Sequence, residues 1–518
     1  MSKPRRSKPN LKQIAQQKFG YTDLRPGQTE AIQAILDGHD VLTIMPTGSG
    51  KSAIYQMAGF LLPGATVVVS PLIALQRDQV NSIAEQNFGD AAMVNSTLST
   101  AEKAETFEQL EDGALEFLFL APEQFNTPET LTRLQEAQPS LFVVDEAHCI
   151  SAWGHNFRPD YLRLGQVIEA LGHPRVLALT ATAAPPVRSE IVERLGMLNA
   201  MTLVQGFDRP NLWLGVERST EEDEKQPQLL QTISHAEKPG IVYVATRKRS
   251  EELAASLQEQ GIRSHHYHAG MKAADRQQVE IDFMQDQIEV LVATTAFGMG
   301  VDKPNVRFVF HADISDSLDS YYQEIGRAGR DGDPAHAILF YNPDDLKLRR
   351  FFASGGQVDE EDTRQVAAVL QQQETAISPK ELQEQVDLSK SKLRSAVNYL
   401  VEVGAVETSP TGEISAVEEL DLDEVAEATL QKQDQRQHIE RSRLEMMRNY
   451  AEVRGCRREY LLNYFGETFT APCGYCDNCK AGIQAESTTH QPFAIDSQVI
   501  HTAWGKGTVM RYEGDKIV

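Results

Sequence analysis

The chain contains 518 residues, too many for one ordinary core, which suggests three or four domains of about 150 residues each. Hydrophobic residues make up 41% and charged residues 24%, as in globular proteins. No apolar run approaches the roughly 18 residues that cross a bilayer. Residues 11–19 are also too polar to be the core of a signal peptide. We therefore expect a cytoplasmic protein that makes no membrane contact.

The net charge of −24 argues against a protein that coats nucleic acid by bulk electrostatics. It does not exclude a protein that grips one strand in a local basic and aromatic groove. Residues 359–434 carry roughly −12 of this charge, so they are a poor electrostatic platform.

Short β-branched runs alternate with longer helical patterns over residues 40–204, which is typical of a parallel sheet covered by helices. Strands are predicted there at residues 41–45, 66–70, 117–120, 141–144, 175–179 and 201–204. The alternation returns with predicted strands at residues 241–244, 264–267, 290–293, 306–310 and 337–341. The sequence thus predicts two tandem α/β lobes, joined by a linker at the polar residues 217–228.

Beyond residue 342 the pattern becomes mostly helical. Helices near residue 360, at 378–388 and at 389–402 precede a short hairpin whose turn reads Ser-Pro-Thr-Gly at 409–412. This order is that of a winged helix, with a generic helical connector as the alternative. A long helix over residues 424–453 then leads to a cysteine cluster. Gly-rich short strands after residue 495 suggest a small β-barrel that is cut short.

Residues 46–52 read Pro-Thr-Gly-Ser-Gly-Lys-Ser, between a predicted strand and a predicted helix. Backbone N–H groups of such a Gly-rich turn ring phosphates, and the helix dipole adds to the attraction. Lys51 would reach the β- and γ-phosphates, and Ser52 would ligate Mg²⁺. Met45 stands where the general phosphate-loop pattern has its first Gly. The predicted nucleotide-binding residues of this loop are Thr47, Gly48, Ser49, Gly50, Lys51 and Ser52.

Residues 145–148, Asp-Glu-Ala-His, follow the apolar strand predicted at 141–144. Parallel strands end at one edge of a sheet, so these carboxylates are expected beside the phosphate loop. Asp145 is the predicted Mg²⁺ ligand, and Glu146 the predicted base that orients or deprotonates water. The alternative is a non-catalytic acidic cap, which would leave the pairing with the phosphate loop unexplained.

Residues 323–330 of the second lobe read Gln-Glu-Ile-Gly-Arg-Ala-Gly-Arg. Arginines placed across a lobe interface stabilise charge on the γ-phosphate when the lobes close. Arg327 and Arg330 are three residues apart, so a helical turn would point both at the cleft. With Gln323 they complete the predicted catalytic set. A solvated basic helix, the alternative, does not explain the Gly beside each Arg.

Four of the five cysteines, Cys456, Cys473, Cys476 and Cys479, fall in one short stretch, which favours metal over disulfides in an intracellular chain. Four thiolates at this spacing predict a closed, structural Zn²⁺ site. An iron–sulfur cluster is the alternative, but the fourth ligand lies upstream and no Cys-Pro follows.

These motifs together resemble superfamily 2 helicases of the RecQ family. The resemblance covers residues 19–341 and resumes at 434–480. The segment 19–28 resembles the family's adenine motif, with Leu24 in place of the usual Phe. By that likeness Tyr21 and Arg25 sandwich the base and Gln28 hydrogen-bonds its edge, so ATP is the expected nucleotide.

The most diagnostic stretch is residues 151–159, which resembles the aromatic-rich loop by which RecQ enzymes sense single-stranded DNA. Exposed aromatic and Arg side chains stack on bases without sequence preference, and this loop is tethered to the catalytic carboxylates. Core packing is the usual role of aromatics in such loops and remains the alternative. The predicted DNA-contacting residues are Trp153, His155, Phe157 and Arg158.

The resemblance implies two RecA-like lobes of the P-loop NTPase class, followed by a winged-helix-like segment, a helical zinc module and a small β tail. The expected domains are residues 1–207, 208–350, 357–432, 433–482 and 490–518. In many RecQ proteins the winged helix follows the zinc module, whereas here the winged-helix-like segment precedes it.

The resemblance further implies a 3′-to-5′ DNA helicase that uses ATP, Mg²⁺ and Zn²⁺ on single-stranded and forked DNA in repair or recombination. In a prokaryote, association with the nucleoid is expected. Two other hypotheses stay open at this point: an RNA helicase of the DEAH type, and a translocase or scaffold that does not unwind. Protein partners are not indicated.

Overall fold

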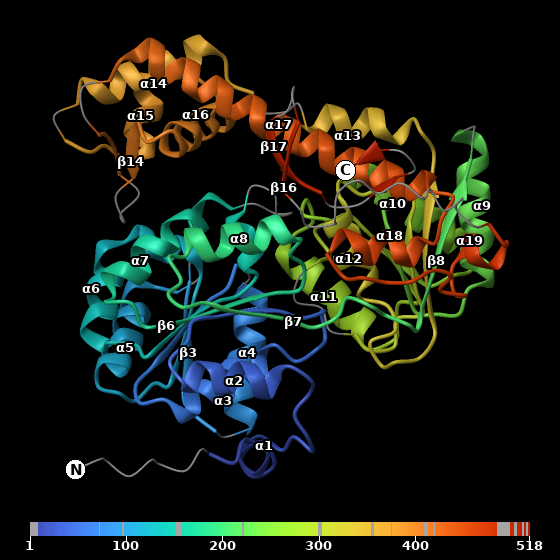
Figure 1. Ribbon diagram of the computed structural model, residues 1–518, viewed down its shortest axis with the longest axis horizontal. Helices are drawn as coiled ribbons and strands as arrows, with labels where there is room; N and C mark the ends of the chain where they lie inside the picture. Colours follow the sequence, from blue (N-terminus) through green and yellow to red (C-terminus); the bar gives the residue numbers. More distant parts are fainter. Residues whose placement is uncertain are drawn as a thin grey trace.

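The computed structural model describes residues 9–71, 73–86, 88–95, 98–151, 158–219, 222–298, 303–353, 357–373, 375–408, 413–417, 420–483, 498–501, 505–509, 512–513 and 516–517. Within these residues, none of the helices combines the length and apolar character that crossing a membrane requires. Two α/β lobes lie side by side, and helical segments cover one end of the pair (Figure 1).

The first lobe is a seven-stranded parallel sheet in the order β3-β4-β2-β5-β6-β1-β7. Its strands are β1 (Val41–Ile44), β2 (Thr66–Val69), β3 (Ala91–Val94), β4 (Phe117–Leu120), β5 (Leu141–Val144), β6 (Arg175–Thr180) and β7 (Met201–Val204). The central strands are apolar on both faces because helices cover both. Since β6 separates β1 from β5, the segments that follow these two strands emerge close together.

The helices of this lobe begin and end at predictable residues. A capping box of Ser99 and Glu102 starts α5, and Pro185 opens α8 at its first turn. The helices are α1 (Leu11–Phe19), α2 (Gln28–Leu36), α3 (Ser52–Leu61), α4 (Ile73–Gln86), α5 (Thr100–Glu111), α6 (Pro128–Ala137), α7 (Leu164–Ala170) and α8 (Pro185–Arg194), with short 3-10 turns η1 (Pro122–Asn126), η2 (Ala147–Ile150) and η3 (Pro159–Arg163).

The second lobe is a six-stranded parallel sheet in the order β10-β11-β9-β12-β13-β8. Its strands are β8 (Leu212–Arg218), β9 (Gly240–Tyr243), β10 (Ser264–Tyr267), β11 (Val290–Ala293), β12 (Phe308–His311) and β13 (Ala335–Tyr341). Its helices are α9 (Glu222–His235), α10 (Arg247–Glu259), α11 (Ala273–Met284), α12 (Leu318–Ile325) and α13 (Asp345–Ala353).

The connection between the lobes lies earlier in the chain than the predicted linker. Residues 217–228 are not a linker, because they hold the end of β8 and the start of α9 within the second lobe. Lys225 of this polar stretch is 1% exposed and pairs with Asp345 at 2.6 Å. The chain instead crosses between the lobes at residues 205–211, which we call the crossing segment.

A separate small unit follows the second lobe. It contains α14 (Glu360–Gln371), α15 (Pro379–Gln385), α16 (Lys390–Glu402), β14 (Val406–Thr408) and β15 (Ile414–Ala416). The hairpin of β14 and β15 is antiparallel, and Ile377, between α14 and α15, bridges to Ile414. This is the expected winged-helix order, with an apolar cluster of its own. We call this unit the winged segment.

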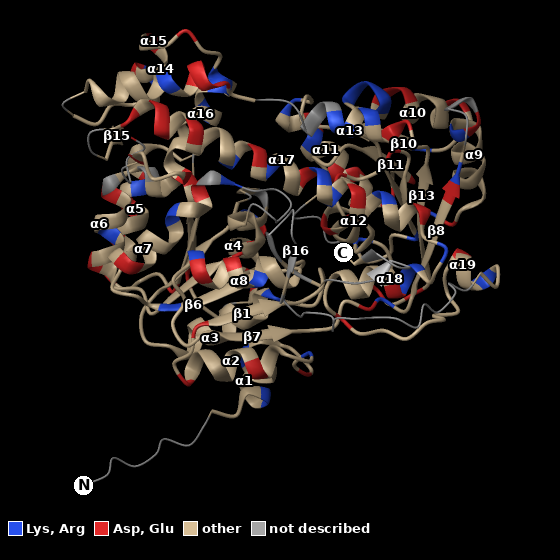
Figure 2. Ribbon diagram, turned by 45° about the horizontal axis from the view of Figure 1, so that its top comes forward, with Lys and Arg blue, Asp and Glu red and all other residues tan. Residues whose placement is uncertain are grey.

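The long helix α17 (Leu422–Glu452) joins the winged segment to the cysteine cluster. Cys456 directly precedes the short helix α18 (Arg457–Tyr464), Cys476 directly precedes the short helix α19 (Asp477–Lys480), and Cys479 lies within α19. Residues 456–480 are called the cysteine module below. The described part of the C-terminal tail forms two antiparallel ladders, β16 (Gln498–His501) with β17 (Gly505–Thr508) and β18 (Tyr512–Glu513) with β19 (Lys516–Ile517). Acidic and basic residues are interspersed along the helices (Figure 2).

Candidate ATP site and cysteine module

The phosphate loop lies between β1 and α3, as the sequence predicts. Gly48 and Gly50 have φ angles of +79° and +81°, which glycine adopts without steric cost. The Lys51 ammonium donates to the Met45 carbonyl at 3.1 Å, so it lies folded over the loop. Burial lowers the pKa of Lys51, and the carboxylates of Asp145 and Glu146 oppose this shift. The loop therefore holds a lysine whose charge lies next to both predicted catalytic acids.

Asp145 and Glu146 follow β5 at the same edge of the sheet. Burial first, and then the charge of Glu146, raise the pKa of Asp145 to about 7. Glu146 has a φ of +49°, a left-handed backbone that is uncommon for any residue except glycine. Such conformations collect at functional sites, and here the turn places two carboxylates beside one lysine.

The donor set at this edge fits a hard divalent cation. The hydroxyl of Ser70 donates to the Asp145 carboxylate at 3.5 Å. Tyr55 is hydrogen-bonded to Ser52 and lies within the electrostatic reach of Asp145, so Ser52 and Asp145 share one neighbourhood. Oxygen ligands from a hydroxyl and a carboxylate are those that Mg²⁺ takes in nucleotide sites.

A hydrogen-bonded path joins the acidic pair to the neighbouring strand β6. His148 contacts Glu146 at 3.3 Å and the hydroxyl of Thr180 at 2.9 Å. That hydroxyl donates to the carbonyl of Thr182 at 2.9 Å. These contacts link Glu146 to residues 180–182, which lead into α8.

The three predicted adenine-motif residues gather next to the phosphate loop. Gln28 is 3% exposed, and its amide donates to the carbonyl of Gly50 at 2.8 Å and accepts from the Arg25 N–H at 2.8 Å. The Arg25 guanidinium donates to the Gly48 carbonyl. Tyr21 donates to Gln56 of α3 at 3.3 Å. These residues thus connect the motif directly to the backbone that surrounds the phosphates.

The second lobe contributes Arg330 to the same site. A Cβ added to Gly48 would lie 3.5 Å from the Arg330 side chain, and the charge of Arg330 acts on Lys51. Arg327 is 4% exposed and is directed instead into its own lobe, beside Gly298 and hydrogen-bonded to Tyr243. Gln323 is also buried. The two arginines therefore face different neighbours, and Arg330 is the one that reaches the phosphate loop.

Of the predicted DNA-contacting residues, Trp153, His155 and Phe157 lie outside the described residues. Arg158 is described and donates to the carbonyl of Pro71 at 3.3 Å, which joins the segment after the aromatic stretch to the start of α4.

The four predicted cysteine ligands form one cluster whose sulfur atoms all lie within 4.8 Å of one another. Backbone N–H groups of Tyr475 and Cys479 donate to the sulfurs of Cys473 and Cys476, both at 3.4 Å. This is the closed, all-sulfur donor set that a structural Zn²⁺ takes, so the cluster fits the metal that the sequence predicted.

Residues that no sequence motif indicated connect the cysteine module and the crossing segment to the ATP site. Arg458 of α18 pairs with Asp208, and Arg209 donates to the carbonyls of Gly326, Ala328 and Gly329. The one sequence signal was the charged stretch Asp-Arg-Pro-Asn at 208–211 between two sheets.

Two parallel-sheet lobes with a phosphate loop, a strand-end acid pair and an arginine from the opposite lobe define an ATP-driven helicase motor. Matching family models are DEAD/DEAH box helicase over residues 25–190, helicase conserved C-terminal domain over 224–332, and RecQ zinc-binding over 416–480. The chain belongs to the RecQ family of ATP-dependent DNA helicases.

Curated relatives agree with this family. The chain is 36% identical to the probable ATP-dependent DNA helicase RecS of Bacillus subtilis, covering 96% of this chain and 99% of RecS. It is 34% identical to the RecQ helicase of Haemophilus influenzae over 91% of this chain and 64% of that protein. It is 33% identical to the RecQ helicase of Bacillus subtilis, over 93% of this chain and 69% of that protein. The chain thus spans about two thirds of these RecQ proteins.

Solved structures share the fold at lower sequence identity. The helicase MrfA bound to DNA has a TM-score of 0.55 at 17% identity, covering 80% of this chain and 60% of that one. Lhr of Mycobacterium smegmatis, bound to single-stranded DNA and AMP-PNP, has a TM-score of 0.51 at 19% identity. The match covers 81% of this chain and 61% of Lhr.

Proposed function

We propose that this RecQ-family protein is a 3′-to-5′ helicase that couples Mg²⁺-dependent ATP hydrolysis to movement along single-stranded DNA. One observation carries the coupling of hydrolysis to movement: Arg330 of the second lobe lies against Gly48 of the phosphate loop in the first. The 3′-to-5′ polarity rests on the resemblance to the RecQ family. Because the ATP site contains residues of both lobes, it is complete only when the lobes are closed. Each cycle of ATP binding and hydrolysis therefore requires the lobes to move relative to each other.

The residues have separable roles in this cycle. Ser52 and Asp145 would hold Mg²⁺, which neutralises phosphate charge when bound. Glu146 orients the attacking water and accepts its proton, while Lys51 and Arg330 stabilise negative charge on the phosphates. The contacts from Glu146 through His148 to Thr180 would carry a change at the phosphates to the end of β6.

The test is unwinding of matched 3′-tailed and 5′-tailed DNA duplexes with ATP and Mg²⁺, with Lys51→Ala as the inactive control. We expect strand separation only from the 3′-tailed substrate. Unwinding from the 5′ tail alone would overturn the polarity. Stimulation of ATP turnover by RNA and not by DNA would favour a DEAH-type RNA helicase. DNA-stimulated turnover without unwinding of either duplex would favour a translocase.

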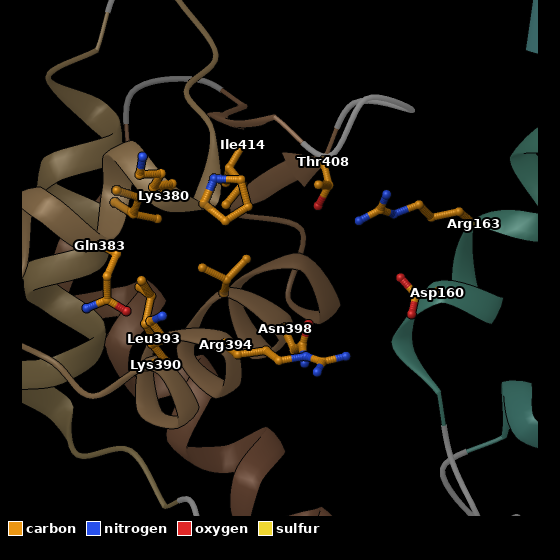
Figure 3. Close-up of a pocket in the computed structure, with 13 residues that line it drawn as sticks. Asp160, Arg163, Lys380, Gln383, Lys390, Leu393, Arg394, Asn398, Thr408 and Ile414 are labelled. Carbon is orange, nitrogen blue, oxygen red and sulfur yellow. The ribbon is translucent and has the colours of Figure 1, made fainter. Parts of the chain in front are cut away.

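We further propose that the duplex arm of a forked substrate contacts a groove between the winged segment and the first lobe. The groove encloses about 440 Å³, and Figure 3 shows Asp160 and Arg163 of the first lobe facing Arg394, Asn398 and Thr408. Its lining residues are Asp160, Arg163, Pro379, Lys380, Leu382, Gln383, Lys390, Leu393, Arg394, Val397, Asn398, Thr408 and Ile414.

The positive charge of this groove favours the phosphates of DNA as its ligand. Lys380, Lys390 and Arg394 are exposed, and within the described ranges no carboxylate lies at ion-pair distance from any of them. Lys and Arg together with Asn, Gln and Thr side chains are the usual donors to phosphate oxygens. Residues 359–434 are acidic overall and were expected to be a poor electrostatic platform, but three of their basic side chains gather at this one groove.

The double substitution Lys390→Glu with Arg394→Glu tests the groove. Affinity for forked DNA should fall, and the salt dependence of binding should lose about one ion per removed contact. Turnover stimulated by single-stranded DNA should stay unchanged. Lys12→Glu with Lys18→Glu on α1, at the opposite end of the molecule (Figure 1), is the charge-matched control. Equal fork affinity in the groove variant and this control would overturn the proposal.

We also propose that the protein acts in DNA repair or recombination and, in a prokaryote, associates with the nucleoid. Loss of Lys51 function in cells should then raise sensitivity to DNA-damaging agents.

A further inference from the structure

The crossing segment is held against the arginine loop, residues 326–330, by unusually dense hydrogen bonding. The guanidinium of Arg209 donates to three carbonyls of this loop, those of Gly326 at 3.1 Å, Ala328 at 2.8 Å and Gly329 at 3.0 Å. Asn211 adds a bond to the Gly329 carbonyl at 2.8 Å. One planar side chain thus fixes the backbone on both sides of Arg327 and directly before Arg330.

The loop conformation depends on this close approach. Gly329 has a φ of +58°, and a Cβ added there would lie 2.5 Å from the Asn211 amide nitrogen and 2.7 Å from the Asp333 carbonyl oxygen. Both contacts are shorter than real Cβ contacts, so glycine is required at this position. The chain therefore turns tightly at Gly329 because Asn211 lies against it, and Arg330 leaves the turn toward Gly48.

The opposite side of the crossing segment is held by the cysteine module. Arg458, two residues after the Cys456 ligand, pairs with Asp208 and donates to the Leu212 carbonyl at 2.6 Å. The Phe465 ring stacks on Phe207 with centroids 4.5 Å apart and planes 13° from parallel. Arg209 thus lies in a segment that is clamped on one side and binds the arginine loop on the other.

We propose that Arg209 is a positioning residue for Arg330, and that the cysteine module fixes Arg209 through Asp208. This inference rests on the proposed role of Arg330 in ATP hydrolysis. Arg209 touches no nucleotide in this scheme and acts only through the carbonyls it binds. Its effect is therefore confined to the step in which Arg330 meets the γ-phosphate.

The first prediction of this scheme concerns Arg209→Lys. Lysine keeps the charge but cannot reach three carbonyls in one plane. A displacement of a catalytic group by about 1 Å costs on the order of 10²-fold in rate. We expect kcat for ATP to fall by that order while KM and the affinity for a non-hydrolysable ATP analogue stay unchanged. Arg133→Lys, which alters a half-buried ion pair to Glu111 on the outer helices, is the matched control.

A double-mutant cycle separates positioning from general stability. In an Arg330→Ala background, Arg209→Lys should produce no further loss of kcat, because the group that Arg209 positions is already gone. Asp208→Asn weakens the pair with Arg458 and should lower kcat less than Arg209→Lys does. In the Arg330→Ala background it should have no effect on kcat, because Arg330 is already absent.

The outcomes are distinct. Additive losses in the cycle, or a full rate for Arg209→Lys, would overturn the positioning role. A full rate for Arg330→Ala alone would overturn the proposed role of Arg330 itself. Should Arg209→Lys fail to fold, the comparison of Asp208→Asn in the two backgrounds distinguishes positioning from general stability in the same way.

Discussion

The cysteine module and the winged segment are neighbours in the chain but are attached to the motor in opposite ways. The module contributes Phe465, Tyr464 and Leu461 to the same apolar cluster as both lobes. The winged segment has a core of its own, with Val366, Leu382 and Leu400 at its centre. The first is thus a structural part of the motor, whereas the second is a unit that α17 carries beside it.

This difference in attachment explains how the motor tolerates the winged segment between the second lobe and the cysteine module. A unit with its own core adds few requirements to the lobes, so it can lie between the second lobe and the cysteine module without disturbing the ATP site. Residues of the module cannot be exchanged so freely, because Arg188 of the first lobe and Asp208 of the crossing segment both bind it. Four substitutions test this contrast.

Cys476→Ser should have the largest effect. A structural Zn²⁺ contributes roughly 10 kcal/mol to small modules, and three ligands do not close the site. We expect loss of bound zinc, unfolding of α18 and loss of ATP turnover, while α14 to α16 keep their hydrogen-exchange protection. Zinc analysis and hydrogen exchange by mass spectrometry check this. Unchanged turnover with zinc absent would show that the module is not part of the motor.

Phe465→Ala comes next. The ring is fully buried and stacks on Phe207, so its removal should cost about 3–5 kcal/mol. Because the cavity opens beside the crossing segment, ATP turnover should fall together with the free energy of unfolding. Urea denaturation and steady-state kinetics measure the two effects.

Leu400→Ala is the counterpart in the winged segment. Leu400 is fully buried, and the truncation should cost about 2–5 kcal/mol locally. We expect a separate, earlier unfolding transition for the winged segment and unchanged turnover with single-stranded DNA. A matching loss of turnover would mean that the two units are coupled as tightly as the module and the lobes.

Arg188→Gln should have the smallest effect. Its guanidinium donates to the Phe465 carbonyl at 2.6 Å and to the Ala183 carbonyl at 3.0 Å. Loss of a charged hydrogen bond costs about 1.5 kcal/mol. Turnover should fall by less than in Phe465→Ala, and calorimetric unfolding should show a small decrease in Tm.

The sequence predicted the two sheets well, and it predicted on which strand ends the ATP-site motifs lie, because both signals are local. Apolar strands that end in turn residues specify where Lys51, Asp145 and Glu146 lie, and the cysteine spacing specifies one cluster. It missed β3 and β8 at the sheet edges, where β3 is only half-buried and β8 mixes apolar and charged residues. The proposed role of Arg209 depends on hydrogen bonds to residues more than one hundred positions later in the chain, and no local sequence pattern indicates them.

Residues 217–228 show how composition misleads. Their charge suggested a solvated linker, but Lys225 is buried against Asp345 and Asp313 and anchors α9 to the second lobe. Charged residues that form buried ion pairs and charged residues of an exposed linker look alike in the sequence. Only the folded structure distinguishes the two.

The 31 residues of α17 also make it a lever arm. At 1.5 Å per residue the helix is about 46 Å long. Its C-terminal half is fixed by Tyr450 and Met447 in the core of the second lobe, and its N-terminal half carries the winged segment. The free half is about 23 Å long, so a tilt of about 10° at its fixed end would sweep the far end by about 4 Å. A small rotation of the second lobe during ATP turnover would therefore reach the groove in Figure 3 as a stroke of roughly one nucleotide spacing along duplex DNA.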